Sequence, residues 1–95
     1  LVYCLRKRAD VPAAEFHRYW LETHGPLVRS FAAAIKARKY IQSHIVLPAM
    51  NDVFAKSRDL APAYDGITEV WWDDVAALEA GMATAEGQEA HRQLK

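Results

Sequence analysis

Residues 16–28 read Phe-His-Arg-Tyr-Trp-Leu-Glu-Thr-His-Gly-Pro-Leu-Val, an aromatic helical pattern that brings a histidine to a Gly-Pro step. At the helical rotation of about 100° per residue, the apolar side chains of this region gather on one face. That face comprises Phe16, Trp20, Leu27 and Phe31. His24 lies close beside it, next to the step in the backbone. A titratable ring in this position is either a reactive group or a tethered core residue, and the pattern alone leaves both readings open.

The segment is predicted to form two helices that are separated at Gly25-Pro26. Asp10 is a suitable capping residue for the first helix, and Pro12 fits its first turn. Gly25 suits the left-handed position just past a helix end, while Pro26 lacks the N–H that continuation would need. We therefore expect the first helix to end at His24 and a second helix to cover residues 27–37.

Three further segments have the pattern of β-strands. Residues 1–7 are short, apolar and aromatic, and residues 67–72 follow the turn-forming pair Asp65-Gly66. Residues 38–47 alternate with a period of two, ending before Pro48. This alternation places two sets of side chains on opposite faces, namely Tyr40, Gln42 and His44 on one and Ile41, Ser43 and Ile45 on the other.

The rest of the chain is predicted to contain one long connection and two helices. Residues 48–64 have no clear period beyond a possible helical turn near residues 53–55, which is typical of a lid or binding loop. Asp73 and Asp74 can cap a helix over residues 75–82. Thr84 can cap a second helix that reaches Leu94.

The order strand, helix, strand, strand, helix predicts an α+β fold of the ferredoxin-like, split βαβ type, as one domain over residues 1–95 with an antiparallel sheet. That topology expects a fourth strand after the last helix, yet the sequence stops at Lys95. With the final strand missing, the first strand should have an unpaired edge.

Both faces of the predicted sheet are apolar, although helices can cover only one of them. The first strand has Leu1, Tyr3 and Leu5 on one face and Val2 and Cys4 on the other; the last strand has Ile67 and Trp71 on one and Val70 and Trp72 on the other. A second copy of the chain is the simplest cover for the remaining face, so we expect a homodimer.

Charge and composition exclude several classes of protein. The chain has 12 Lys and Arg against 12 Asp and Glu, a net charge of +0, which argues against a nucleic-acid partner. No apolar run approaches the roughly 20 residues of a membrane span, so no membrane partner is expected. Cys4 is the only cysteine, which favours a reducing, cytoplasmic compartment, and its apolar surroundings predict an inert packed thiol.

Two motifs resemble the EthD domain family. They are Phe16-x-x-Tyr19-Trp20-x-x-x-His24-Gly25-Pro26-Leu27-Val28 and the later run from Tyr64 to Trp72, Tyr-Asp-Gly-Ile-Thr-Glu-Val-Trp-Trp. The resemblance implies a dimeric α/β barrel, in which two ferredoxin-like sheets pack face to face with their helices outside. The wider group includes polyketide cyclases and dehydratases, cofactor-free monooxygenases and haem enzymes. A shared fold does not by itself establish which chemistry applies.

Four residues are the candidates for catalysis. His24 can exchange a proton near neutral pH; Tyr40 and His44 can donate to or polarise a ligand; Glu69, between apolar neighbours on its strand, can carry a proton or orient a histidine. Each also has a structural interpretation. His24 would be a tie to a nearby carbonyl, Tyr40 and His44 a polar sheet face, and Glu69 the partner of an arginine or of backbone donors across a dimer interface. Trp20, Gln42 and Trp71 are predicted to line the substrate pocket.

The remaining histidines, His17 and His91, are predicted to be solvated. No two histidines have helical metal-ligand spacing, and no glycine-rich phosphate loop is present, so neither a metal site nor a cofactor is expected.

Three functional hypotheses follow. The first is a small-molecule enzyme, a cyclase or dehydratase (a lyase) or a monooxygenase-like oxidoreductase, that performs proton-transfer chemistry on a hydrophobic, aromatic or polyketide-like compound. The second is a non-catalytic dimeric binding or accessory protein. The third is a haem protein with His24 or His44 as the axial ligand.

Overall fold

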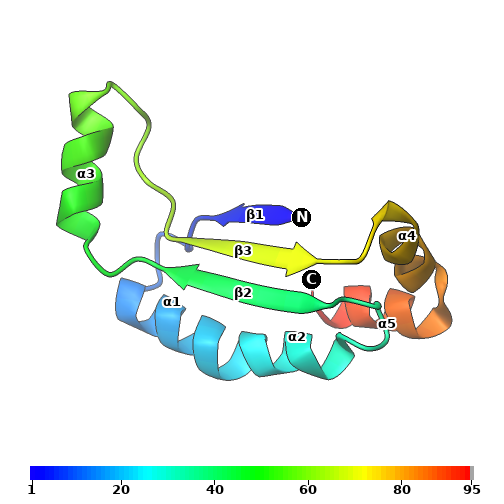
Figure 1. Cartoon of the computed structure of the whole chain (residues 1–95). Coiled ribbons are helices and arrows are strands. Elements are labelled where there is room, and N and C mark those ends of the chain that lie inside the picture. Colours follow the sequence, from blue (N-terminus) through cyan, green and yellow to red (C-terminus); the bar gives the residue numbers. More distant parts are fainter. Residues whose placement is uncertain (95) are drawn as a thin grey trace.

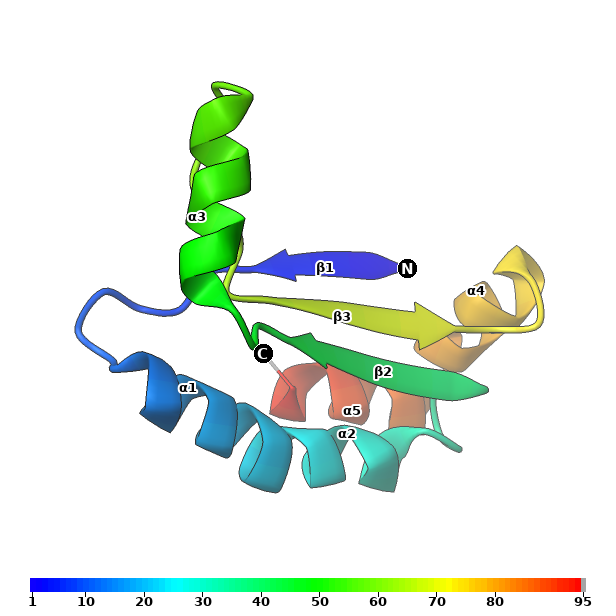
Figure 2. The same ribbon diagram turned by 60° about the vertical axis from the view of Figure 1, so that its left-hand side comes forward.

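The computed structural model describes residues 1–94 and shows an α+β fold built on an antiparallel sheet. Strands β1 (Val2–Leu5), β3 (Gly66–Trp71) and β2 (Lys39–His44) lie side by side in the order β1-β3-β2. The long helix of residues 13–31 and helix α5 (Ala85–Gln93) cover one face of the sheet (Figures 1 and 2). This arrangement confirms the predicted ferredoxin-like class. Within the described residues the sheet has three strands, and β1 forms one edge.

The register of the strands determines which side chains share a face. Thr68 in the central strand lies opposite Tyr3 of β1 and Gln42 of β2. Because side chains alternate along a strand, the face toward the helices also carries Val70 and Tyr40. The opposite face, here called the open face, carries Val2, Cys4, Ile41, Ile67, Glu69 and Trp71.

The helix does not end at Gly25, so the predicted break is wrong. Helix α1 (Ala13–Tyr19), the π-helical turn η1 (Trp20–His24) and helix α2 (Gly25–Phe31) form one continuous rod. Gly25 has right-handed helical angles (φ −58°, ψ −53°), and its N–H bonds the carbonyl of Trp20, five residues back. Since a π turn is wider than an α turn and shifts the hydrogen bonds by one residue, it admits the ring of Pro26 without ending the helix.

The π turn also changes which residues of the helix are buried. The extra residue per turn rotates everything that follows it, so the buried side chain of α2 in line with Trp20 is Val28. Ile35, in the turns after the helix, is buried as well. Leu27 and Phe31, which the uniform helical period placed on that face, are only half-buried. The helix is also shorter than predicted, because α2 ends at Phe31 and irregular turns lead to β2.

Helix α3 (Pro48–Ser57) occupies the segment that was expected to be a loop. It rises on the open side of the sheet, away from the other helices (Figure 2), and none of its residues is buried. Its apolar side chains Met50, Val53 and Phe54 are about half exposed. The sequence pattern did not predict this helix, because turn-forming residues flank it at both ends and its apolar face is weak.

The N-caps predicted for the last two helices are present in the structure, whereas the N-cap predicted for the first helix is not. The Asp74 carboxylate accepts the N–H of Ala77 at 2.8 Å, starting α4 (Val75–Ala83), and the Thr84 hydroxyl accepts the N–H of Gly87 at 2.9 Å, starting α5. Asp10 instead pairs with Arg8, and α1 begins after Pro12 without a side-chain cap.

The core is small and centres on Trp20, whose indole packs against Gly66 at the start of the central strand. A Cβ atom on Gly66 would lie 2.3 Å from Cζ3 of that indole, so only glycine allows this approach. Val28, Ile35, Val70 and Ala90 complete the buried apolar set. Cys4 is exposed rather than packed as predicted, because it lies on the open face, which no element within residues 1–94 covers at this position.

Candidate functional site

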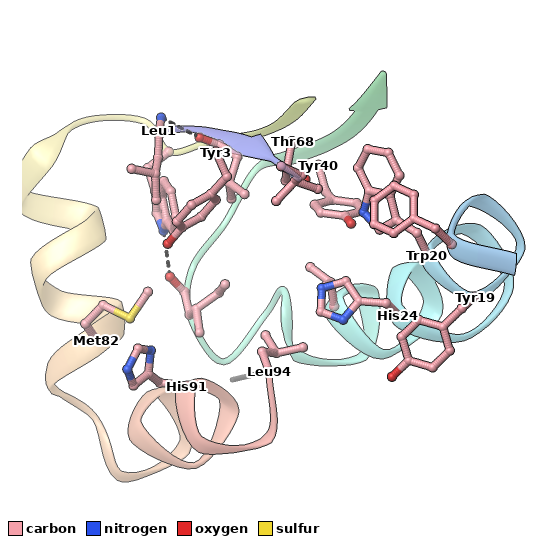
Figure 3. A pocket seen from close by; sticks show the side chains of 16 residues that line it. Leu1, Tyr3, Tyr19, Trp20, His24, Tyr40, Thr68, Met82, His91 and Leu94 are labelled. Carbon is pink, nitrogen blue, oxygen red and sulfur yellow. Dashed lines mark hydrogen bonds between the residues drawn. The ribbon is translucent and has the colours of Figure 1, made fainter. Parts of the chain in front are cut away.

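A cavity of about 500 Å³ lies between the helix-covered face of the sheet, the long helix and α5. Figure 3 shows the side chains that surround it, which come from both ends of the chain as well as from its middle. The walls are mainly apolar, with Phe16, Trp20, Val28, Val70, Trp72 and Leu94 among them. This volume and lining are typical of a pocket for a small ring compound.

His24 is the half-buried imidazole of this cavity. It ends the π turn, and its ring projects from the helix toward the hollow (Figure 3). Burial lowers the pKa of His24, because an apolar environment disfavours the charged ring. Within residues 1–94 the ring has no hydrogen bond, so the alternative role as a tie to a nearby carbonyl is not what the fold shows. A neutral, unpaired imidazole in an apolar cavity can accept a proton at neutral pH.

Tyr40 brings a hydroxyl to the same cavity from strand β2. Its oxygen lies 2.8 Å from Nε2 of Gln42, and the same nitrogen donates to the carbonyl of Trp20 at 2.7 Å. Gln42 thereby ties the strand to the π turn. A Cβ on Gly25 would approach this amide to 3.1 Å, so the glycine next to His24 serves close packing instead of a helix stop.

Behind Trp20 lies a pair of histidines. Nδ1 of His17, in α1, is 2.8 Å from Nδ1 of His44, in β2, and Nε2 of His44 is 2.8 Å from Oε1 of Gln42. The His44 ring also stacks on the indole of Trp20, with centroids 4.3 Å apart. Burial, and secondly the neighbouring His17, lower the pKa of His44.

The structure therefore divides the predicted site residues into three groups. Trp20, His24 and Tyr40 border the cavity. Gln42 and His44 stand in the hydrogen-bonded row behind it. The last two, Glu69 and Trp71, point to the open face, so within one chain the sheet separates them from His24. Of the predicted site residues, Glu69 and Trp71 therefore lie apart from the cavity.

The two histidines that were predicted to be solvated have different surroundings in the structure. His17 is half-buried against His44 rather than solvated, and the signal for this was its position three residues before Trp20, one helical turn away. His91 is exposed, as predicted, yet it borders the cavity on the wall opposite His24 (Figure 3). Spacing along the sequence gave no indication that α5 would fold back to this place.

Neither a metal centre nor a membrane span is found in the described part of the chain. No group of three or more His, Cys, Asp or Glu side chains in residues 1–94 is placed to hold a metal ion. None of the helices there has the length and apolar character required to cross a bilayer.

An antiparallel sheet with a helix-lined cavity on one face places the chain among ferredoxin-like α+β proteins. Comparison with known families identifies the family within this class. The sequence model of the EthD domain matches residues 8–93, so the chain belongs to the EthD domain family. The fold is similar to that of an ethyl tert-butyl ether d (EthD) family protein from Bacillus halodurans, with a TM-score of 0.60 and 22% identity. The match covers 96% of this chain and 77% of that one. No curated protein matches the sequence.

Proposed function

We propose that this chain is a small-molecule enzyme that transfers protons within its apolar cavity, with His24 as the general base and acid. The observation that carries the proposal is the position of His24: it is half-buried on the cavity wall, free of hydrogen bonds within residues 1–94, and has a pKa lowered by burial. An imidazole in this state is neutral at physiological pH and ready to take a proton from a bound carbon or hydroxyl group.

The cavity supports an aromatic or polyketide-like substrate. Its indole and phenyl walls can stack on flat rings, and its volume of about 500 Å³ accommodates two or three fused rings. Enolisation next to a carbonyl is the shared first step of aldol-type cyclisation and of dehydration. Membership in the EthD family is compatible with such lyase chemistry and with cofactor-free oxidation, both of which begin by removing a proton.

Deuterium exchange into 2-tetralone, an aromatic bicyclic ketone with acidic α-hydrogens, tests this function without knowledge of the natural substrate. In D₂O at neutral pH, the wild type should accelerate exchange at the α-carbons, as followed by proton NMR. His24→Ala should lose this acceleration while still binding the ketone. Thr23→Ala is the matched control, since it truncates an exposed side chain next to His24 on the same helix but outside the cavity.

Binding of the ketone without His24-dependent exchange would contradict the enzymatic proposal and favour the alternative of a binding or accessory protein. The haem alternative would have to rest on His24, because both ring nitrogens of His44 are already in hydrogen bonds. A Soret band that appears when haem is added and disappears in His24→Ala would support that reading instead.

We further propose that a second copy covers the open face. Val2 and Trp71 on this face are 59% and 53% exposed, and the half-exposed apolar residues of α3 stand beside it. Apolar surface gathered in this way marks an interaction site. Glu69 would then lie within the interface, where its structural interpretation places it. The single free cysteine, Cys4, on the same face is consistent with a reducing, cytoplasmic location.

A further inference from the structure

The amide of Gln42 has only one chemically sensible orientation. The main-chain oxygen of Trp20, 2.7 Å away, can only accept a hydrogen bond, so the Gln42 atom that faces it must be the nitrogen. The same NH₂ group is 2.8 Å from the Tyr40 hydroxyl. Because an NH₂ group only donates, the oxygen of Tyr40 is the acceptor in this contact.

The oxygen of the Gln42 amide determines which ring nitrogens of the two histidines carry a hydrogen. Oε1 of Gln42 accepts a hydrogen bond from Nε2 of His44, which therefore carries the hydrogen of the neutral ring. Nδ1 of His44 is then an acceptor, and it receives the hydrogen on Nδ1 of His17. Every donor in the row His17, His44, Gln42, Tyr40 points in one direction, from helix α1 toward the cavity.

The row ends at a hydroxyl whose own hydrogen is still available. Within residues 1–94 no protein group accepts the hydrogen of the Tyr40 hydroxyl, and the side chain borders the cavity. Hydrogen bonds that follow one direction polarise each other, which makes the last donor stronger. The Tyr40 hydroxyl is thus held as a donor toward whatever fills the cavity.

We infer that Gln42 is a positioning residue that aims the Tyr40 hydroxyl at the ligand, and that the cavity takes apolar ring compounds carrying a carbonyl or enolate oxygen. The inference rests on the proposed function and narrows its substrate class. A donor fixed in this way matches an oxygen acceptor and not a second donor. It is also suited to the negative charge that develops on that oxygen when a proton is removed beside it.

Infrared difference spectroscopy of 2-tetralone, labelled with carbon-13 at the carbonyl, measures this contact directly, because a donated hydrogen bond lowers the carbonyl stretching frequency. The bound ketone should have a lower frequency in the wild type than in Tyr40→Phe, and Tyr40→Phe should bind it about fivefold more weakly, the usual effect of one hydrogen bond. Gln42→Glu keeps the shape of the side chain but offers a carboxylate that accepts the Tyr40 hydrogen. It should raise the frequency as Tyr40→Phe does.

Gln88→Glu, the same chemical change at an exposed position of α5, is the control and should keep the wild-type frequency. Gln42→Leu, which removes the amide without adding charge, replaces Gln42→Glu in the test if that variant does not fold. The comparison of the wild type with Tyr40→Phe shows in either case whether Tyr40 donates to the carbonyl. An unchanged frequency in Tyr40→Phe or in the folded Gln42 variants would overturn the inference, as would the lack of a bound carbonyl band in the wild type. His24→Ala should lose exchange but keep the lowered frequency, so failure of the proposed function is distinguishable from failure of this inference.

Discussion

The Nδ1 atoms of His17 and His44 lie 2.8 Å apart, so one hydrogen bond between two imidazoles ties helix α1 to strand β2 beside the central tryptophan. This contact needs a donor on one ring and an acceptor on the other. Two charged rings would place two donors and two positive charges against each other.

The first prediction concerns the dependence of stability on pH. The pKa of His44 is lowered in the folded chain, by burial first and by His17 second, and that of His24 is lowered by burial, so the unfolded chain binds more protons than the folded one in this range. The contribution of these histidines to the free energy of unfolding is therefore fully present above the pKa of an unfolded histidine, about 6.5. It decreases as the pH falls toward their lowered pKa values in the folded chain. Urea unfolding at about pH 7.5 and about pH 5.5 measures this.

Variants measure the part of this effect that comes from the histidine pair, which is second to burial. His17→Leu removes one partner and should reduce the pH dependence, although the protein loses a hydrogen bond worth about 1 kcal/mol. His91→Gln, a change at an exposed histidine, should keep the wild-type slope. Equal slopes in His17→Leu and the wild type would show that the pair does not limit protonation.

The second prediction concerns the contact between Gly66 and Trp20. Gly66→Ala should destabilise the chain by about 1–3 kcal/mol, because the new Cβ would lie 2.3 Å and 2.6 Å from two atoms of the indole. Thermal or urea unfolding measures the loss. In a Trp20→Leu background the same substitution should cost less, since the ring that causes the overlap is gone. Equal costs in both backgrounds would contradict this packing.

These two contacts illustrate what the sequence could and could not predict. The alternation over residues 40–44 correctly placed Tyr40, Gln42 and His44 on one face, because strand periodicity is a local property. The caps at Asp74 and Thr84 were equally local. The π turn could not be predicted from local sequence, because a Gly-Pro pair is also typical of a helix end. The packing of Gln42 against Gly25 depends on a strand that follows later in the chain.

Glu69 shows a second limit of the sequence. It lies between apolar neighbours on its strand and is half-buried. Which layer it faces depends on the pairing register of β3 with β1 and β2, which brings Glu69 opposite Val2 and Ile41 on the open face. A shift of one residue would have turned it toward His24. Local pattern thus identified the candidates, whereas the register decided which of them meet.

The third prediction concerns the cap of helix α4. Asp74→Ala should lower the free energy of unfolding by about 1 kcal/mol, because the N–H of Ala77 loses its side-chain acceptor. The neighbouring Asp73 is an informative control, since its contact with Arg38 is an exposed ion pair at 3.3 Å. Asp73→Ala should therefore have a smaller effect on urea unfolding. The reverse order of the two effects would contradict the capping role.

The fourth prediction concerns the open face. Trp71→Glu should convert the proposed homodimer into a monomer, because a dimer would have to bury the new carboxylate among apolar residues. Light scattering at micromolar concentration measures the mass. Val75→Glu adds the same charge at an exposed position of α4, outside the open face, and should leave the mass unchanged. A wild-type chain that is monomeric under these conditions would refute the second copy as the cover of this face.

The fifth prediction follows from the lowered pKa of His24. If the neutral imidazole is the base, the rate of exchange into 2-tetralone should rise with pH and level off, with its midpoint below the ordinary histidine value of about 6.5. A charged histidine at an exposed helix end would give a midpoint at or above that value. Tyr40→Phe should lower the plateau, since the enolate loses a donor, but it should leave the midpoint in place. A midpoint that shifts in Tyr40→Phe and is still present in His24→Ala would show that a group other than His24 titrates, which would contradict the prediction.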